Sequence, residues 1–142
     1  MASESRASTV WTGSLEKGRG ETTTVSGVLQ GVEVTWPNRV ERTEGTTSPE
    51  ELLAAAHATC YCMGLSHELS GRGNPPERLE ASAVVGFVAG EGIKSSRLTV
   101  SGTVDGIDEV TFQEAASAAA EGCPVSGALR GNVEVTVEAT LR

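Results

Sequence analysis

Polar and β-branched residues alternate through the first third of the chain, a pattern that predicts extended structure. Residues 8–13 and 21–28 are rich in Thr and Val. Further along, Val32, Val34 and Trp36 alternate with polar neighbours, as expected of a half-buried strand. Four glycines supply turns between these stretches: Gly18, Gly20, Gly27 and Gly31. The pattern therefore predicts an antiparallel meander of short strands.

The periodicity changes near residue 48, where a long helix is predicted to begin. Ser48 fits the N-cap, Pro49 fits the first helical position, and Glu51 completes a capping box. The helix is predicted to end at about residue 70, because glycines and prolines follow. One face collects six residues at helical spacing: Leu52, Ala56, Thr59, Cys60, Met63 and His67. The small side chains in its alanine-rich middle predict a buried, central helix.

Alternation returns in the second half of the chain. Residues 78–89 and 93–104 predict a hairpin of two strands. A second helix is expected over residues 109–121 and a short one over residues 125–129. Residues 132–141 alternate strictly and predict the last strand. The order of three strands, a helix, two strands, two helices and a strand is α+β, with helices packed on antiparallel sheets.

Length and charge limit the kind of protein that this can be. A chain of 142 residues is long enough for one compact domain, and we expect residues 1–142 to form it. The net charge of -8 argues against a nucleic-acid partner, because Lys and Arg drive binding to phosphate backbones. No stretch approaches the ~20 apolar residues of a membrane helix, and the N-terminus lacks a signal-peptide core. We therefore expect a cytoplasmic protein with no membrane partner.

Three cysteines, Cys60, Cys62 and Cys123, carry the candidate chemistry. An odd count without a predicted signal peptide argues against a structural disulfide framework. Cys123 lies between Gly122 and Pro124 at the start of the short helix, where free N–H groups favour a thiolate. Cys60 lies in mid-helix, where apolar burial raises the pKa of a thiol. Physical chemistry alone therefore predicts Cys123 as the more acidic thiol, while a small buried hydrophobic residue is the alternative interpretation of each.

A metal site is the next interpretation to test, since two histidines lie near the first two cysteines. Cys60 and Cys62 point about 200° apart on a helix, whereas zinc favours a Cys-x-x-Cys pair in a turn. His57 shares a face with Cys60, but one such pair supplies too few ligands. We therefore expect no metal and no cofactor, a structural Cys62, and a surface or sheet-facing His67.

Two segments resemble the cysteine motifs of the OsmC/Ohr family, the osmotically inducible protein C and organic hydroperoxide resistance group. Residues 47–60, TSPEELLAAAHATC, resemble the first motif, and GCPVS at residues 122–126 resembles the second. The opening Trp-Thr-Gly at residues 11–13 and the turn at residues 26–29 also fit, so the resemblance spans nearly the whole chain. The Ala-His-Ala before Cys60 is more similar to the OsmC branch than to the Ohr branch.

The resemblance implies a cysteine-based peroxidase that reduces organic hydroperoxides. It also implies hydrogen peroxide as a further substrate. Cys60 would be the nucleophile that becomes a sulfenic acid, and Cys123 would resolve it as a disulfide. Arg39 matches the family's arginine, which would stabilise the thiolate, and Glu50 matches the acidic partner that would hold the guanidinium. The alternatives for these two roles are Arg19 and Glu51. The implied reductant is a dithiol such as a lipoyl group.

Spacing along the long helix adds an inference about assembly. Glu50 and Cys60 are ten residues apart, which separates them by ~15 Å on one straight helix. A carboxylate cannot organise a site around a thiol at that range. If both belong to one site, two chains must contribute, which predicts an intertwined homodimer with antiparallel contact of the central helices. The resemblance implies the same dimer and an OsmC-like fold.

Two other functions fit the same residues. One is a non-enzymatic stress protein of the same fold that binds a hydrophobic ligand in the dimer cleft. The other is a redox sensor that relays a disulfide to a partner. A count of free thiols before and after exposure to an alkyl hydroperoxide would distinguish the peroxidase from the ligand-binding protein.

Overall fold

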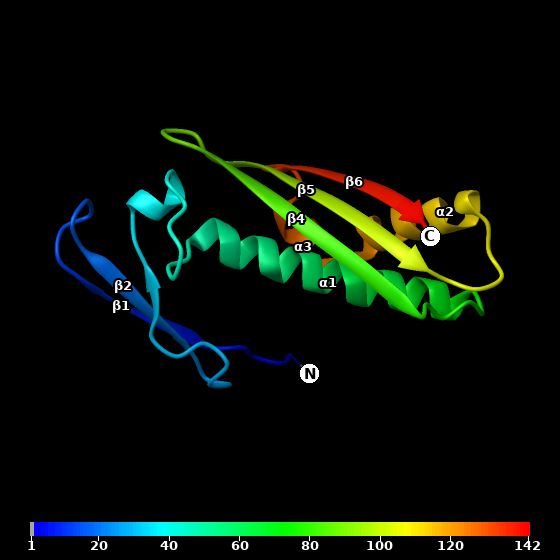
Figure 1. Cartoon of the computed structure of the whole chain (residues 1–142), viewed down its shortest axis with the longest axis horizontal. Coiled ribbons are helices and arrows are strands. Elements are labelled where there is room, and N and C mark those ends of the chain that lie inside the picture. Colours follow the sequence, from blue (N-terminus) through cyan, green and yellow to red (C-terminus); the bar gives the residue numbers. More distant parts are fainter. Residues whose placement is uncertain (1) are drawn as a thin grey trace. The chain divides into compact units, whose positions relative to one another are not determined.

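The helices and strands follow the predicted order along the chain (Figure 1). The computed structural model describes residues 2–142. The elements are β1 (Ala7–Thr12), β2 (Arg19–Thr24), β3 (Val32–Val34), the 3-10 helix η1 (Pro37–Arg39), α1 (Pro49–Gly71), β4 (Arg78–Val88), β5 (Gly92–Thr103), α2 (Glu109–Gly122), α3 (Pro124–Leu129) and β6 (Glu134–Leu141). The chain divides into an N-terminal unit that ends at Leu52 and a C-terminal unit, Leu53–Arg142, which are described separately. A single domain over residues 1–142 stays a prediction.

The N-terminal unit contains the predicted antiparallel meander. Its three strands pair in the order β1-β2-β3, with Trp11 opposite Gly20 and Gly20 opposite Val34. β2 ends earlier than predicted, because Thr24 closes a turn by donating its N–H to the carbonyl oxygen of Leu29 at 3.0 Å. No hydrophobic side chain of residues 2–52 is buried. This small sheet therefore has no hydrophobic core of its own.

The start of α1 confirms the predicted N-cap. The hydroxyl oxygen of Ser48 accepts a hydrogen bond from the backbone N–H of Glu51 at 3.1 Å, which satisfies one of the unpaired donors of the first turn. The Glu51 carboxylate accepts a hydrogen bond from the Thr47 hydroxyl. The backbone then continues helically to Gly71, one residue beyond the predicted end.

The C-terminal unit contains a second sheet, in the order β4-β5-β6, and this sheet is mixed. β4 and β5 form the predicted antiparallel hairpin, but β5 and β6 run parallel. The expectation of purely antiparallel sheets was therefore wrong. α2 and α3 form a helical crossover between β5 and β6, and a connection of this length returns the chain so that the next strand can lie parallel.

α1 and α2 pack against the sheet of the C-terminal unit (Figure 1). Every fourth residue of α1 lies in the interior, and these residues are His57, Tyr61, Leu65 and Leu69. They meet side chains from β5 and α2, among them Leu98, Val100, Phe112 and Ala116. The opposite face of α1 is uncovered in a single chain: Met63 is 70% exposed, and Thr59 and His67 are also exposed. Cys60 lies between the two faces and is half-buried.

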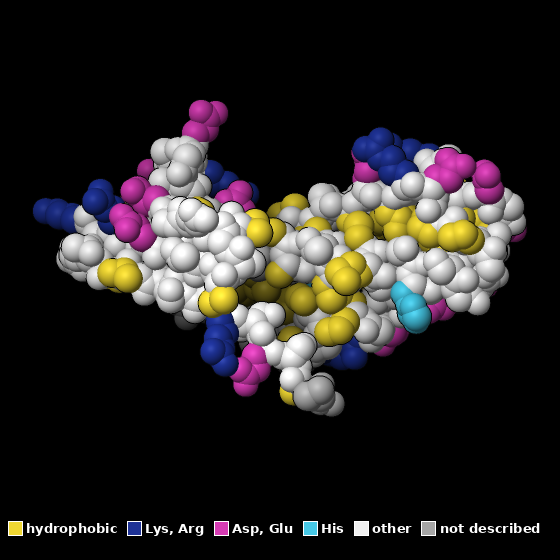
Figure 2. Space-filling view, turned by 90° about the horizontal axis from the view of Figure 1, so that it is seen from below, with side chains coloured by type: hydrophobic (Ala, Val, Ile, Leu, Met, Phe, Trp, Pro, Cys, Tyr) yellow, Lys and Arg dark blue, Asp and Glu magenta, His cyan; other side chains and the backbone are white. Residues whose placement is uncertain are grey.

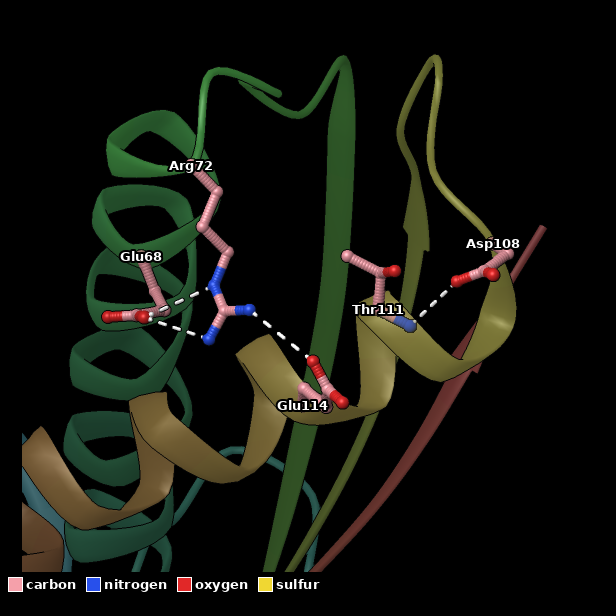
Figure 3. Close-up of polar contacts among 5 residues, drawn as sticks. All are labelled: Glu68, Arg72, Asp108, Thr111 and Glu114. Carbon is pink, nitrogen blue, oxygen red and sulfur yellow. Dashed lines mark hydrogen bonds and ion pairs between the residues drawn. The ribbon is translucent and has the colours of Figure 1, made fainter.

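Polar contacts hold α2 at its start and against the end of α1 (Figure 3). Asp108 is the N-cap of α2 and accepts a hydrogen bond from the Thr111 N–H at 2.8 Å. Arg72 forms ion pairs with Glu68 at 3.2 Å and with Glu114 of α2 at 3.7 Å. Because α2 leads directly to Cys123, these contacts help to fix the position of that cysteine.

Candidate active site

Cys60 and Cys123 come together in the C-terminal unit. Cys60 lies in the middle of α1, and Cys123 joins α2 to α3 as the N-cap of α3. The two thiols lie close enough for each to shift the pKa of the other, and both cysteines are free. Cys60 is half-buried, whereas Cys123 is only 1% exposed. The two cysteines singled out in the sequence therefore form one pair, of which Cys60 is the more accessible.

Hydrogen bonds make Cys123 the more acidic partner. Burial raises the pKa of the Cys123 thiol, but the hydrogen bonds that it accepts outweigh this effect and the net shift is downward. These bonds come from the backbone N–H and the hydroxyl of Ser126, from the Cys60 thiol and from the Val125 N–H. The Ser126 N–H lies 3.5 Å from the sulfur. The prediction that Cys123 is the more acidic thiol is thus supported.

The same contact has the opposite effect on Cys60. Burial raises the pKa of the Cys60 thiol, the Val125 N–H lowers it, and both the hydrogen bond to Cys123 and the charge of Cys123 raise it further. The net shift is upward. Within residues 2–142 of a single chain, no cation contributes to this balance. Cys60 therefore needs an additional positive group if it is to act as a thiolate near neutral pH.

His57 is fully buried beside this pair and was not expected to join the site. Its Nδ1 lies 2.7 Å from the hydroxyl oxygen of Ser96 in β5, and its Nε2 lies 2.8 Å from that of Ser126 in α3. Burial lowers the pKa of His57, so the ring is neutral at ordinary pH. No sequence pattern links these three residues, because they come from three different elements.

The remaining candidate ligands lie apart from this cluster. Cys62 faces β4, where burial raises its pKa and a hydrogen bond with the Ala81 backbone lowers it, with a net upward shift. His67 is exposed. In the described part of the chain, no group of three or more His, Cys, Asp or Glu side chains is arranged to hold a metal ion.

Arg39 and Glu50 form the other predicted pair, inside the N-terminal unit. Nε of Arg39 donates to Oε2 of Glu50 at 3.3 Å, and Nη2 lies 2.9 Å from Oε1. The guanidinium also stacks on Trp36, with 5.2 Å between its central carbon and the ring centroid. Glu50 is only 5% exposed, so its carboxylate makes this contact largely away from water. Arg19, the alternative arginine, is exposed at the start of β2.

A cavity of about 220 Å³ lies next to this arginine in the N-terminal unit. Its lining is mostly apolar: Trp11, Leu15, Val34, Thr35, Trp36, Arg39 and Pro49. An apolar pocket with one fixed cation suits a small ligand that has a hydrophobic body and an oxygen-bearing head. The pocket was not foreseen, although Trp11 and Trp36 are the only two tryptophans of the chain.

Comparisons with known proteins point to one family. The family described as OsmC-like protein matches residues 42–138. Peroxiredoxin OsmC of Escherichia coli strain K12 is 37% identical over 135 residues, covering 93% of this chain and 92% of the relative. Organic hydroperoxide resistance protein OhrB of Bacillus subtilis strain 168 is 34% identical over 122 residues, covering 84% and 88%. A crystal structure of an organic hydroperoxide resistance protein OsmC from Legionella pneumophila has the same fold, with a TM-score of 0.74, 22% identity, and coverage of 99% and 98%.

Proposed function

Because the chain belongs to the OsmC-like protein family, we propose that it is a thiol-dependent peroxidase that reduces organic hydroperoxides to alcohols. The relatives at 37% and 34% identity are named as a peroxiredoxin and an organic hydroperoxide resistance protein. The observation that carries the proposal for this chain is the pair of neighbouring free thiols, Cys60 and Cys123, each of which shifts the pKa of the other. A thiol that a substrate can reach, next to a second thiol that can resolve it, is the arrangement that a two-cysteine peroxidase requires.

In the proposed reaction the Cys60 thiolate attacks the terminal oxygen of the hydroperoxide. The O–O bond breaks, the alcohol leaves with a proton, and Cys60 becomes a sulfenic acid. The Cys123 thiolate then attacks the Cys60 sulfur, a disulfide forms, and the sulfenic oxygen leaves as water after taking up a proton. Accessibility supports this division of roles, because Cys60 is the thiol that a substrate can reach.

Arg39 and Glu50 are proposed to supply the positive charge that Cys60 lacks in a single chain. A bidentate contact with a buried carboxylate and stacking on Trp36 hold the guanidinium in a defined orientation. The spacing of Glu50 and Cys60 along α1 favours a site in which one chain supplies Arg39 and its partner supplies Cys60. The apolar pocket beside Arg39 would then receive the organic part of the hydroperoxide.

A homodimer is proposed on the basis of the surfaces that a single chain leaves uncovered. Met63 is 70% exposed on the face of α1 that also carries Ala55, Ala56 and Thr59. Figure 2 shows hydrophobic side chains gathered on one side of the C-terminal unit. Small residues around one long apolar side chain allow two helices to approach closely. The sheet of the N-terminal unit, which has no hydrophobic core of its own, also needs a cover.

Met63→Glu is therefore expected to weaken the dimer at least roughly hundredfold, because an unpaired carboxylate would be buried between the helices. Sedimentation equilibrium at several protein concentrations measures the change. Val110→Glu is the matched control, since Val110 is 64% exposed on α2, outside the proposed contact. A wild-type chain that sediments as a monomer at micromolar concentration would contradict the proposal, as would a Met63→Glu variant that dimerises normally.

The peroxidase itself is tested by counting free thiols before and after one equivalent of tert-butyl hydroperoxide. Two of the three thiols of each chain are expected to disappear, with one equivalent of alcohol released. Retention of all three thiols would contradict the proposal and favour a ligand-binding protein. A stable mixed disulfide with another protein, without repeated turnover, would indicate a sensor instead.

The reductant and the location of the protein also belong to this proposal. A disulfide between Cys60 and Cys123 must be reduced before the next cycle, and a dithiol such as a lipoyl group is the proposed donor of electrons. A cytoplasmic location stays a prediction. Between residues 2 and 142, none of the helices combines the length and the apolar character needed to span a membrane.

A further inference from the structure

His57 is a fully buried ionisable side chain for which the proposed reaction has no role. Both of its ring nitrogens are bound by hydroxyl groups, Nδ1 by Ser96 at 2.7 Å and Nε2 by Ser126 at 2.8 Å. Ser96 is 0% exposed and Ser126 only 2%, so bulk water does not compete for these contacts. A buried polar network of this kind is stable only when every member has a partner. The network ends at Cys123.

The hydrogen bonds of Ser126 determine which group donates and which accepts at each contact of this network. Ser126 contacts Cys123 directly, because its backbone N–H lies 3.5 Å from the sulfur, and its side chain is among the groups that lower the pKa of that thiol. Since a hydroxyl group stabilises a thiolate only as a donor, we assign the Ser126 hydroxyl proton to the sulfur. A hydroxyl group donates only one proton, and Ser126 must therefore accept from His57 at Nε2. A neutral imidazole with its proton on Nε2 accepts at Nδ1, and the Ser96 hydroxyl is the donor there. Donation thus runs from Ser96 through His57 and Ser126 to Cys123.

We propose that His57 is a positioning residue for Cys123: it holds the Ser126 hydroxyl as a donor to the sulfur and so keeps Cys123 ready to attack the oxidised Cys60. The inference rests on the proposed peroxidase function, in which Cys123 resolves the sulfenic acid. His57 exchanges no proton with the substrate in this scheme. It acts as a neutral donor, a state that its burial favours.

The other titratable groups that face Cys123 do not account for the same effect. Cys60 donates a hydrogen bond to Cys123 only while it is a thiol, and oxidation to the sulfenic acid removes that S–H donor. Tyr61 donates its hydroxyl to the Ala116 carbonyl oxygen at 2.9 Å, and burial raises its pKa, so it stays neutral. At the resolving step, Ser126 and the backbone N–H of Val125 therefore remain as donors.

The first experiment measures the pKa of Cys123 from thiolate absorbance against pH in a Cys60→Ser background. His57→Leu removes the donor to Ser126 at similar volume, and we expect it to raise the pKa of Cys123 by about one unit, a tenfold loss of thiolate below that pKa. Ser126→Ala, which keeps the backbone N–H bond to Cys123, should cause a similar rise. His57→Gln places an amide N–H near the position of Nε2 and should restore most of the wild-type value.

The second experiment follows disulfide formation after a single addition of tert-butyl hydroperoxide to chains that retain Cys60. At pH 7, His57→Leu should slow the step roughly three- to tenfold, since the loss of thiolate is partly offset by the greater nucleophilicity of a more basic thiol. The defect should disappear at pH values above both thiol pKa values. A purely structural role would not produce this dependence on pH, and it would not be restored in His57→Gln.

The outcomes separate this inference from the proposed function. A folded His57→Leu variant with an unchanged pKa of Cys123 and an unchanged rate would overturn the inference, as would a His57→Gln variant that behaves like His57→Leu. If His57→Leu does not fold, Ser126→Ala decides the matter by the same two measurements. A wild-type chain that consumes no hydroperoxide would refute the peroxidase, while the titration of Cys123 would still test the hydrogen-bond chain.

Discussion

Cys60→Ser is expected to abolish the reduction of organic hydroperoxides, whereas Cys123→Ser is expected to permit one turnover and then stop. A serine hydroxyl is not ionised near neutral pH and cannot replace the thiolate, so a loss of roughly 10³-fold or more is expected. Without Cys123, the sulfenic acid of Cys60 forms but no disulfide follows. Moles of hydroperoxide consumed per chain, measured without added dithiol, should be near zero for the first variant and near one for the second.

Cys62→Ser is the matched control for this experiment. Cys62 lies on the same helix as Cys60 but faces β4, and its raised pKa makes it a poor nucleophile. Its replacement should leave turnover essentially unchanged. Full activity in Cys60→Ser, or loss of activity in Cys62→Ser alone, would show that the reactive thiol has been assigned to the wrong residue.

Arg39→Ala is expected to raise the pKa of the Cys60 thiol and to reduce the rate of its oxidation. An opposite charge within ~4–6 Å typically lowers the pKa of an acid by about 1–3 units, so its loss should lower the thiolate fraction near pH 7 by roughly 10- to 10³-fold. Arg39→Lys retains the charge but not the planar contact with Glu50, and an intermediate rate is expected. Thiolate absorbance against pH in a Cys123→Ser background measures the shift.

Arg19→Ala is the control for Arg39, because Arg19 is the other arginine that the sequence allowed for this role. Its exposed side chain at the start of β2 should be dispensable. A normal pKa of Cys60 in Arg39→Ala, combined with a raised one in Arg19→Ala, would transfer the role to Arg19. An unchanged value in both variants would mean that the thiolate of Cys60 is stabilised without either arginine.

Most elements of the fold could be predicted from local patterns. The capping residue Ser48 and the glycines after residue 70 locate α1 to within a residue, because these signals are local. The direction of β6 could not be predicted, since strict alternation in residues 132–141 fits a parallel or an antiparallel neighbour equally well. The face of α1 that packs against the sheet could not be predicted either. It carries the polar His57, whose partners Ser96 and Ser126 lie on other elements.

In the candidate site, too, contacts between neighbours in the sequence could be predicted, whereas contacts between separate elements could not. The environment of Cys123 could be predicted because its donors, Val125 and Ser126, follow it directly in the chain. The contact of Cys123 with Cys60 was implied only by the family resemblance, and the network of His57 was not foreseen at all. Ser96 and Ser126 contact His57 because β5 and α3 pack against α1. The spacing of these residues in the sequence does not predict the contacts.

The difference in burial between the two cysteines also fixes the direction in which the oxidised protein can be recycled. An incoming thiolate can reach the sulfur of Cys60, while Cys123 at 1% exposure is shielded. Attack there expels Cys123, whose depressed pKa makes it the better leaving group. The transient mixed disulfide should thus form on Cys60, with the resolving sulfur returned to its hydrogen-bond donors before the reductant has departed.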